Sequence, residues 1–148
     1  MRSGRRILLR LAGQSATTDT ASAQTVFTAF APGSIASFWL GLRGPKQTLT
    51  VIVGRDPGRS PSYWFGPDLP AGDGFDIHVA IYPDMGPGGL LYRYHDTARW
   101  SSFNSTTARG FEQLSWPQQW AIGHGQGDAE DRPFKGAALS VQIAQTES

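Results

Sequence analysis

The chain has 148 residues, the length of one typical domain, and is long enough to bury about two-thirds of its unfolded surface. Hydrophobic residues make up 39% of it, and its 18 Gly and 10 Pro favour many short strands with turns over disorder. A net charge of +1 argues against a nucleic-acid partner, and the absence of cysteine excludes disulfides, thiolate nucleophiles and cysteine-ligated zinc.

The first thirty residues differ from the rest. RRILLRLAG could form a strand with Ile7, Leu9 and Leu11 on one face, but the QSATTDTASAQ that follows is small, polar and typical of a linker. We therefore divide the chain into residues 1–30, a basic and polar arm or a first strand plus linker, and residues 31–148, a β-domain. An ordered arm would dock on other protein subunits.

The N-terminus does not predict a clear signal peptide, although its basic start resembles one. Arg10 interrupts the apolar run after three residues, and polar residues follow it. No apolar stretch approaches the length that crosses a membrane, so we expect no membrane span.

Period-2 alternation dominates the rest of the chain and indicates half-buried antiparallel strands. Their connections, such as GRDPGRSPS and PDMGPGG, are dense in turn-forming residues. Together these features favour a β-sandwich or a barrel. The inward-facing residues are expected to be Phe38, Leu40, Leu42; Leu49, Val51, Val53; Phe75, Ile77, Val79, Ile81; and Leu139, Val141, Ile143.

Three stretches carry a resemblance to a known family: SFWLGL, GFDIHVAIYPDMGPGGLLYRY and WAIGHGQGDAEDRPFKGAALSVQI. In this order they resemble the concanavalin A-like jelly roll, and within it the laminin-G-like domains. The resemblance implies an all-β, antiparallel β-sandwich of two packed sheets, with ligands on the concave face or the loop rim. The chain departs from the family where Thr97 follows Asp96, because an Asp-Gly pair is common there. This fold hosts lectins, hydrolases, lyases and structural parts of virus particles, so it does not by itself imply an enzyme.

The stretch YRYHDTARW predicts a sugar-binding platform. Trp100 can offer its ring to the apolar face of a pyranose while His95 and Asp96 read hydroxyl groups. The competing interpretation is a turn in which Asp96 bonds local backbone amides. Trp39 and Arg43 at the strand SFWLGLR are further candidates for glycan contact.

Catalysis is the alternative reading. A glycoside hydrolase normally needs two paired carboxylates, and no expected strand provides such a pair, whereas a lyase needs a base and a charge-neutralising group. His78, Tyr82 and Arg43 are the residues that such a lyase would use. The other interpretation of His78 is the packed, hydrogen-bonded histidine of a laminin-G-like hairpin.

Five tryptophans are more than a small sandwich core needs. Trp120 alternates with Ile122 and is expected in the core. Trp64 and Trp116 flank turns and are expected as exposed contacts, because exposed aromatic residues dominate binding hot spots.

The stretch IGHGQGDAEDRPFKG is expected as a rim loop between the last two strands. It supplies His124 and Asp128 for ligand contact. Asp128 and Glu130 are also a calcium candidate, because calcium prefers several oxygens around a tight loop.

We therefore predict a non-catalytic glycan-binding, adhesion or assembly module, such as a spike or fibre component of a phage-like particle or cell surface. It would contact polysaccharide, with no cofactor apart from the calcium candidate. We expect it outside the cell or on a particle surface, after cytoplasmic synthesis. The candidate glycan-binding residues are Trp39, Arg43, His95, Asp96, Trp100, His124 and Asp128.

Overall fold

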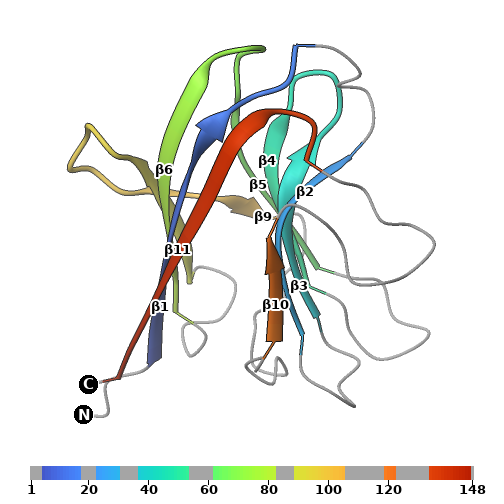
Figure 1. Cartoon of the computed structure of the whole chain (residues 1–148). Helices are drawn as coiled ribbons and strands as arrows, with labels where there is room; N and C mark the ends of the chain where they lie inside the picture. Colours follow the sequence, from blue (N-terminus) through green and yellow to red (C-terminus); the bar gives the residue numbers. More distant parts are fainter. Residues whose placement is uncertain are drawn as a thin grey trace.

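The computed structural model describes residues 5–17, 23–30, 37–53, 62–82, 89–105, 119–122 and 134–147. These residues form strands and turns, with no helix among them, and two sheets pack against each other (Figure 1). The described chain therefore holds no helix with the length and apolarity needed to span a membrane. The predicted all-β sandwich of antiparallel sheets is confirmed.

Sheet A has the strand order β11-β1-β6-β7-β8, and sheet B has the order β10-β2-β3-β4-β5-β9, with antiparallel pairing throughout. The strands of sheet A are β1 (Arg5–Gln14), β6 (Gly74–Ile81), β7 (Leu90–Tyr94), β8 (Ser101–Ser102) and β11 (Ala137–Glu147). The strands of sheet B are β2 (Gln24–Phe30), β3 (Ser37–Arg43), β4 (Thr48–Val53), β5 (Ser62–Asp68), β9 (Asn104–Ser105) and β10 (Gln119–Ile122).

The N-terminal segment, for which the sequence left an arm or a first strand open, is an interior strand. β1 pairs with β11 on one side and with β6 on the other. β2 is also interior, between β10 and β3. The strands of residues 5–14 and 24–30 are therefore each paired on both sides within the two sheets.

The core follows the alternation of the strands. The predicted inward residues of β1, β3, β4 and β6 are buried between the sheets except for Phe75. Phe75 and the inward residues of β11 are only partly buried and pack against the core. The largest fully buried side chains are Trp64, Phe27, Phe38, Ile7, Leu9, Leu11, Leu40, Leu42, Leu49, Ile77 and Ile81.

The expectation of an exposed Trp64 is wrong. Trp64 lies within β5, where Tyr63 and Phe65 face outward, so its own side chain points into the core and is fully buried. The proline and glycine beside it gave the appearance of a turn, but Trp64 pairs with Val51 of the neighbouring strand. Trp116 lies outside the described residues, and so do the side chains of β10, including Trp120.

Two buried glutamines tie the connections at one end of the sandwich together. The side-chain amide of Gln47 donates to the carbonyl oxygen of Ala16 at 3.0 Å, and its oxygen accepts from the backbone N–H of Ala16 at 3.2 Å. The same oxygen accepts from the side chain of Gln24 at 3.1 Å, whose own oxygen accepts from the backbone N–H of Lys135 at 3.0 Å. Because buried polar groups are costly unless bonded, this network fixes the turn 44–47 relative to three other segments.

Replacing Trp64 with alanine tests whether its side chain is buried in the core. The cavity left by a fully buried indole should lower the free energy of unfolding by about 3–5 kcal/mol, measured by urea denaturation. Trp100→Ala is the matched control, because that side chain is 38% exposed and its loss should cost about 1 kcal/mol or less. Equal effects of the two substitutions would contradict the buried position of Trp64.

Candidate functional site

A cluster of charged and imidazole side chains lies on the outer face of sheet A. Arg10 alternates with buried leucines on β1, and Asp76 and His78 alternate with buried residues on β6, so all three point away from the core. The pairing of the two strands places Arg10 opposite His78. His95 follows β7, and its backbone N–H donates to the carbonyl oxygen of Asp76 at 2.8 Å, which holds the turn against β6.

Arg10 and Asp76 form a two-pronged ion pair. The Nε of Arg10 donates to one carboxylate oxygen at 2.9 Å, and an Nη donates to the other at 2.7 Å. This hydrogen bonding holds the pKa of Asp76 below its usual range, against an opposing effect of burial, and the charge of Arg10 adds to it. Asp76 therefore stays ionised at neutral pH.

The two histidines of the cluster meet edge to edge. Nε2 of His78 lies 2.9 Å from Nδ1 of His95, while the ring centroids are 5.2 Å apart and the ring planes differ by 18°. Because the centroids are much farther apart than the nitrogens, the rings do not lie face to face, and a hydrogen bond joins their edges.

The proton of this bond can be assigned from its neighbours. An Nη of Arg10, which can only donate, lies 3.4 Å from Nε2 of His95. Nε2 of His95 therefore accepts, its proton is on Nδ1, and Nδ1 donates to Nε2 of His78.

The pKa of His78 is lowered. Burial is the largest cause, and the charges of Arg93, His95 and Arg10 lower it further, whereas Asp76 partly opposes them. Separately from this shift, the hydrogen bond to His95 supports the interpretation of His78 as a hydrogen-bonded residue of the β6–β7 hairpin.

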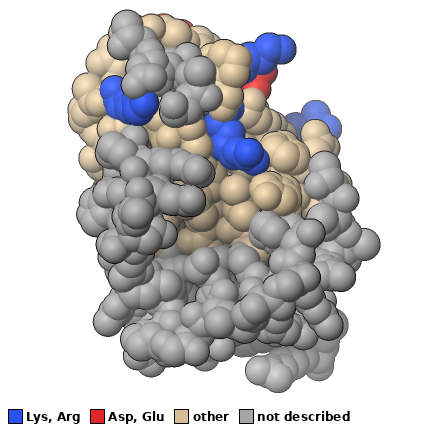
Figure 2. Space-filling view, turned by 90° about the vertical axis from the view of Figure 1, so that its right-hand side faces the viewer, with Lys and Arg blue, Asp and Glu red and all other residues tan. Residues whose placement is uncertain are grey.

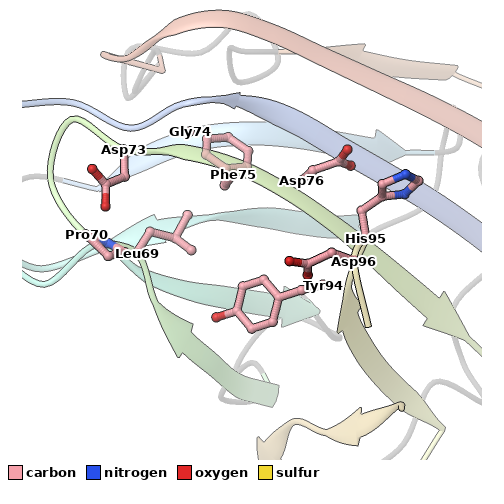
Figure 3. A pocket seen from close by; sticks show the side chains of 9 residues that line it. All are labelled: Leu69, Pro70, Asp73, Gly74, Phe75, Asp76, Tyr94, His95 and Asp96. Atoms are coloured by element: carbon pink, nitrogen blue, oxygen red, sulfur yellow. The ribbon is translucent and has the colours of Figure 1, made fainter. Parts of the chain in front are cut away.

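A pocket of about 480 Å³ lies beside this cluster, at the end of the sandwich where β6 begins and β7 ends (Figure 3). Phe75 and Asp76 come from β6, Tyr94, His95 and Asp96 come from the end of β7 and its turn, and Leu69 faces Tyr94 across the pocket. Pro70, Asp73 and Gly74 complete the lining.

The walls of this pocket are held in place from both sides. On one side, the side chain of Gln14 donates to the carbonyl oxygen of Gly72 at 2.9 Å, and the backbone N–H of Ser15 donates to that of Asp73 at the same distance. On the other side, Arg93 donates to the carbonyl oxygen of Thr97 at 2.8 Å and closes the turn that presents His95.

The pocket combines aromatic rings with free carboxylates. Tyr94 is 38% exposed, and burial raises the pKa of its hydroxyl, with Tyr92 and Asp68 adding to the effect, so the hydroxyl remains a donor. The side chains of Asp73 and Asp96 are exposed and make no ion pair or hydrogen bond with described residues. They are therefore free to accept from a ligand.

Of the predicted glycan-binding residues, His95 and Asp96 line this pocket together. Trp100 does not line it; its ring lies under the guanidinium of Arg93, 5.2 Å from the ring centroid. His124, Asp128 and Glu130 lie outside the described residues, and the calcium candidate lies there with them.

Trp39 and Arg43 lie on the opposite face of the molecule, the outer face of sheet B, because Phe38, Leu40 and Leu42 of the same strand face the core. The indole of Trp39 lies over Gly41, where a Cβ would come within 2.5 Å of the ring, and its N–H donates to Thr25 at 3.0 Å.

The guanidinium of Arg43 lies 5.6 Å from the ring centroid of Tyr63. Figure 2, which shows the molecule from the side of sheet B, shows described Lys and Arg side chains that lie apart rather than in one patch. Trp39 and Arg43 are therefore not brought together with His95 and Asp96.

The three residues of the predicted lyase are not brought together either. Arg43 and His78 lie on the outer faces of different sheets. Tyr82 follows β6 four residues after His78, which places the two backbones roughly 13 Å apart along the strand direction.

Sequence reasoning missed Arg10, Phe75 and Tyr94 as residues of the site. Arg10 falls in the segment predicted as a basic arm or a first strand, and its partner Asp76 is 66 positions away. The signal for Arg10 is its place in a strand pattern between two buried leucines, which indicates an outward side chain within a sheet.

Asp76, His78 and His95 are also the described residues that could hold a metal ion, since one ligand atom from each lies within 4.8 Å of the other two.

Comparison with known proteins gives one solved structure to report. The chain is similar to scytalido-glutamic peptidase, in a crystal structure with a peptide-based transition-state analogue, at 13% identity and a TM-score of 0.44 over 99% of this chain and 76% of that chain. No protein-family model and no curated protein matches the chain. A likeness at this level does not identify a shared activity.

The shifted pKa of His78 can be measured directly. In a pH titration followed by NMR, the ring of His78 should titrate below 6.5, its ordinary value, because burial and nearby positive charges disfavour the imidazolium. The unfolded chain then binds more protons than the folded one, so the free energy of unfolding should fall as the pH drops below about 6.5.

His78→Gln should remove part of this pH dependence, because glutamine keeps a hydrogen-bonding group but does not titrate. A His78 ring that titrates at or above 6.5 in the folded protein would contradict the expected lowering of its pKa.

Proposed function

We propose that this protein is a non-catalytic glycan-binding module and that the pocket between β6 and the turn after β7 is its sugar site. The observation that carries the proposal is the combination, in one pocket of about 480 Å³, of the rings of Phe75 and Tyr94 with the carboxylates of Asp73 and Asp96. This volume lies within the range of small-ligand sites, about 300–1,000 Å³.

The chemistry of the lining suits a pyranose. An aromatic ring packs against the C–H face of a sugar, and Tyr94 offers such a ring with part of its surface open to solvent. Free carboxylates accept hydrogen bonds from sugar hydroxyls, and Asp96 lies next to Tyr94 in the lining. His95 adds a ring whose position is fixed by its bond to His78.

The charge of the pocket favours neutral or amino sugars over uronates. Asp73 and Asp96 add negative charge, and Arg10, which contacts the lining residue Asp76, is already bound to its carboxylate. A uronate carboxylate would therefore meet like charges. The same consideration disfavours the alternative of a uronate-cleaving lyase, whose proposed residues His78, Tyr82 and Arg43 lie apart.

The proposal also includes a biological role for the domain, namely adhesion. A laminin-G-like sandwich that binds surface polysaccharide would act in adhesion, either at a cell surface or as a spike or fibre component of a phage-like particle. The resemblance of the strand sequences to that family supports this role, and so does a pocket whose walls are held by hydrogen bonds on both sides.

Binding to immobilised neutral and amino-sugar glycans, followed by calorimetry with the best ligand, tests the proposed site. Tyr94→Ala and Asp96→Asn should each weaken binding about tenfold or more, because the first removes the ring and the second replaces a charged acceptor oxygen with an amide donor. Trp39→Ala and Arg43→Ala are the controls, since they remove an aromatic ring and a charged group from the opposite face.

The proposed site is wrong if the two control substitutions abolish binding while the pocket variants keep it. The absence of any glycan ligand would overturn the proposed function itself. Release of unsaturated uronate products from a polysaccharide would establish the enzyme instead.

A further inference from the structure

We propose that Asp76, His78 and His95 form a binding site for a divalent transition-metal ion such as Zn²⁺, and that Arg10 occupies this site in the metal-free protein. Asp76 and His95 also line the pocket proposed for sugar, but the metal proposal does not depend on sugar binding, because it rests on the donor atoms of the outer face of sheet A.

The donor set has the composition of known metal sites. Two imidazole nitrogens and one carboxylate oxygen are ligands that zinc and related ions use when one or more positions remain open to water or substrate. Ligand atoms of the three residues lie within 4.8 Å of one another. Small side-chain rotations can therefore bring them around a single ion.

The backbone positions these three side chains close together before a metal ion binds. Asp76 and His78 are two positions apart on β6, so their side chains leave the same face of the strand. His95 comes from the turn after β7. The hydrogen bond from its backbone N–H to the carbonyl oxygen of Asp76 fixes that turn beside β6. Little chain ordering is needed on binding, which favours affinity.

Arg10 already takes the place of a cation among these donors. One Nη lies 2.7 Å from the carboxylate of Asp76 and 3.4 Å from Nε2 of His95. The Arg10 side chain is 37% exposed, so it can swing into solvent without crossing the core. The ion pair is thus a competitor of the metal.

Departure of Arg10 frees all three ligands at once. While Arg10 donates to Nε2 of His95, the ring must carry its proton on Nδ1, the atom that faces His78. Without Arg10 the proton can move to Nε2, so that Nδ1 of His95 and Nε2 of His78 present lone pairs to the same point. The carboxylate of Asp76 is released in the same movement. No net proton is gained or lost in this rearrangement.

The charges around the three residues influence how tightly Zn²⁺ should bind. Arg93 lies opposite His78 in the pairing of β6 with β7, and its positive charge opposes a bound cation. We therefore expect micromolar rather than nanomolar affinity for Zn²⁺.

Calorimetric titration of the full, untagged chain with ZnCl₂ at pH 7.5 tests the site. His95→Ala and His78→Ala should each weaken binding at least about tenfold, the scale of effect expected at a metal centre. Arg10→Gln should strengthen binding, because it removes the competing cation but keeps a polar side chain. Lys46→Ala, which changes an exposed residue of the turn between β3 and β4 in sheet B, should leave the affinity unchanged.

Co²⁺ provides a second readout, since direct imidazole ligation gives visible absorption bands that are lost in His95→Ala. Failure of Zn²⁺ to bind at millimolar concentration would overturn the proposal, as would affinity unchanged in both His78→Ala and His95→Ala, or weaker binding in folded Arg10→Gln. If Arg10→Gln does not fold, Arg10→Lys gives the same comparison, because lysine cannot form the two-pronged pair and should also bind Zn²⁺ more tightly.

Discussion

The pairing of β1 on both of its edges is the constraint on which the rest of this structure depends. β11 lies on one side of β1 and β6 on the other, so the first and last strands of the described chain complete the same sheet. Its apolar side chains Ile7, Leu9 and Leu11 supply the part of the core beneath both neighbours. Sheet A therefore forms only after strands from both ends of the described chain have come together, and such long-range pairing makes folding slow.

The same strand also builds the site, because alternate residues of a strand face opposite sides of the sheet. Leu9 and Leu11 point inward, and Arg10 between them points outward to the carboxylate of Asp76. A shift of register by one residue would bury the guanidinium and expose the leucines. The core thus fixes the register that places Arg10 beside Asp76 and His78, and the chemistry of the outer face is a consequence of apolar packing on the inner one.

Much of this fold could be predicted from local patterns, because burial alternates along each strand and turns carry Gly, Pro and Asp. The inward faces of β3 and β4 were predicted residue by residue. Trp64 was not, since the pattern around it is interrupted by proline and glycine. The ion pair of Arg10 and Asp76 was not predicted either, because 66 positions separate its members. Strand order decides such contacts, and periodicity does not reveal strand order. His95 and Asp96 were found because they are neighbours in sequence, whereas Tyr94 beside them was overlooked.

The pairing of β1 with β11 also decides how the domain can be joined to other structures. Arg5 lies opposite Glu147, so the chain enters and leaves sheet A at one point, whereas the pocket begins beside Gln14 at the far end of β1, roughly 30 Å away (Figure 1). A host protein could carry the domain as an insertion in a single surface loop, and new termini could be opened elsewhere, because adjacent ends tolerate both changes. A structure attached beside Arg5 and Glu147 would therefore lie at the end of sheet A away from the pocket, and the pocket would face away from it.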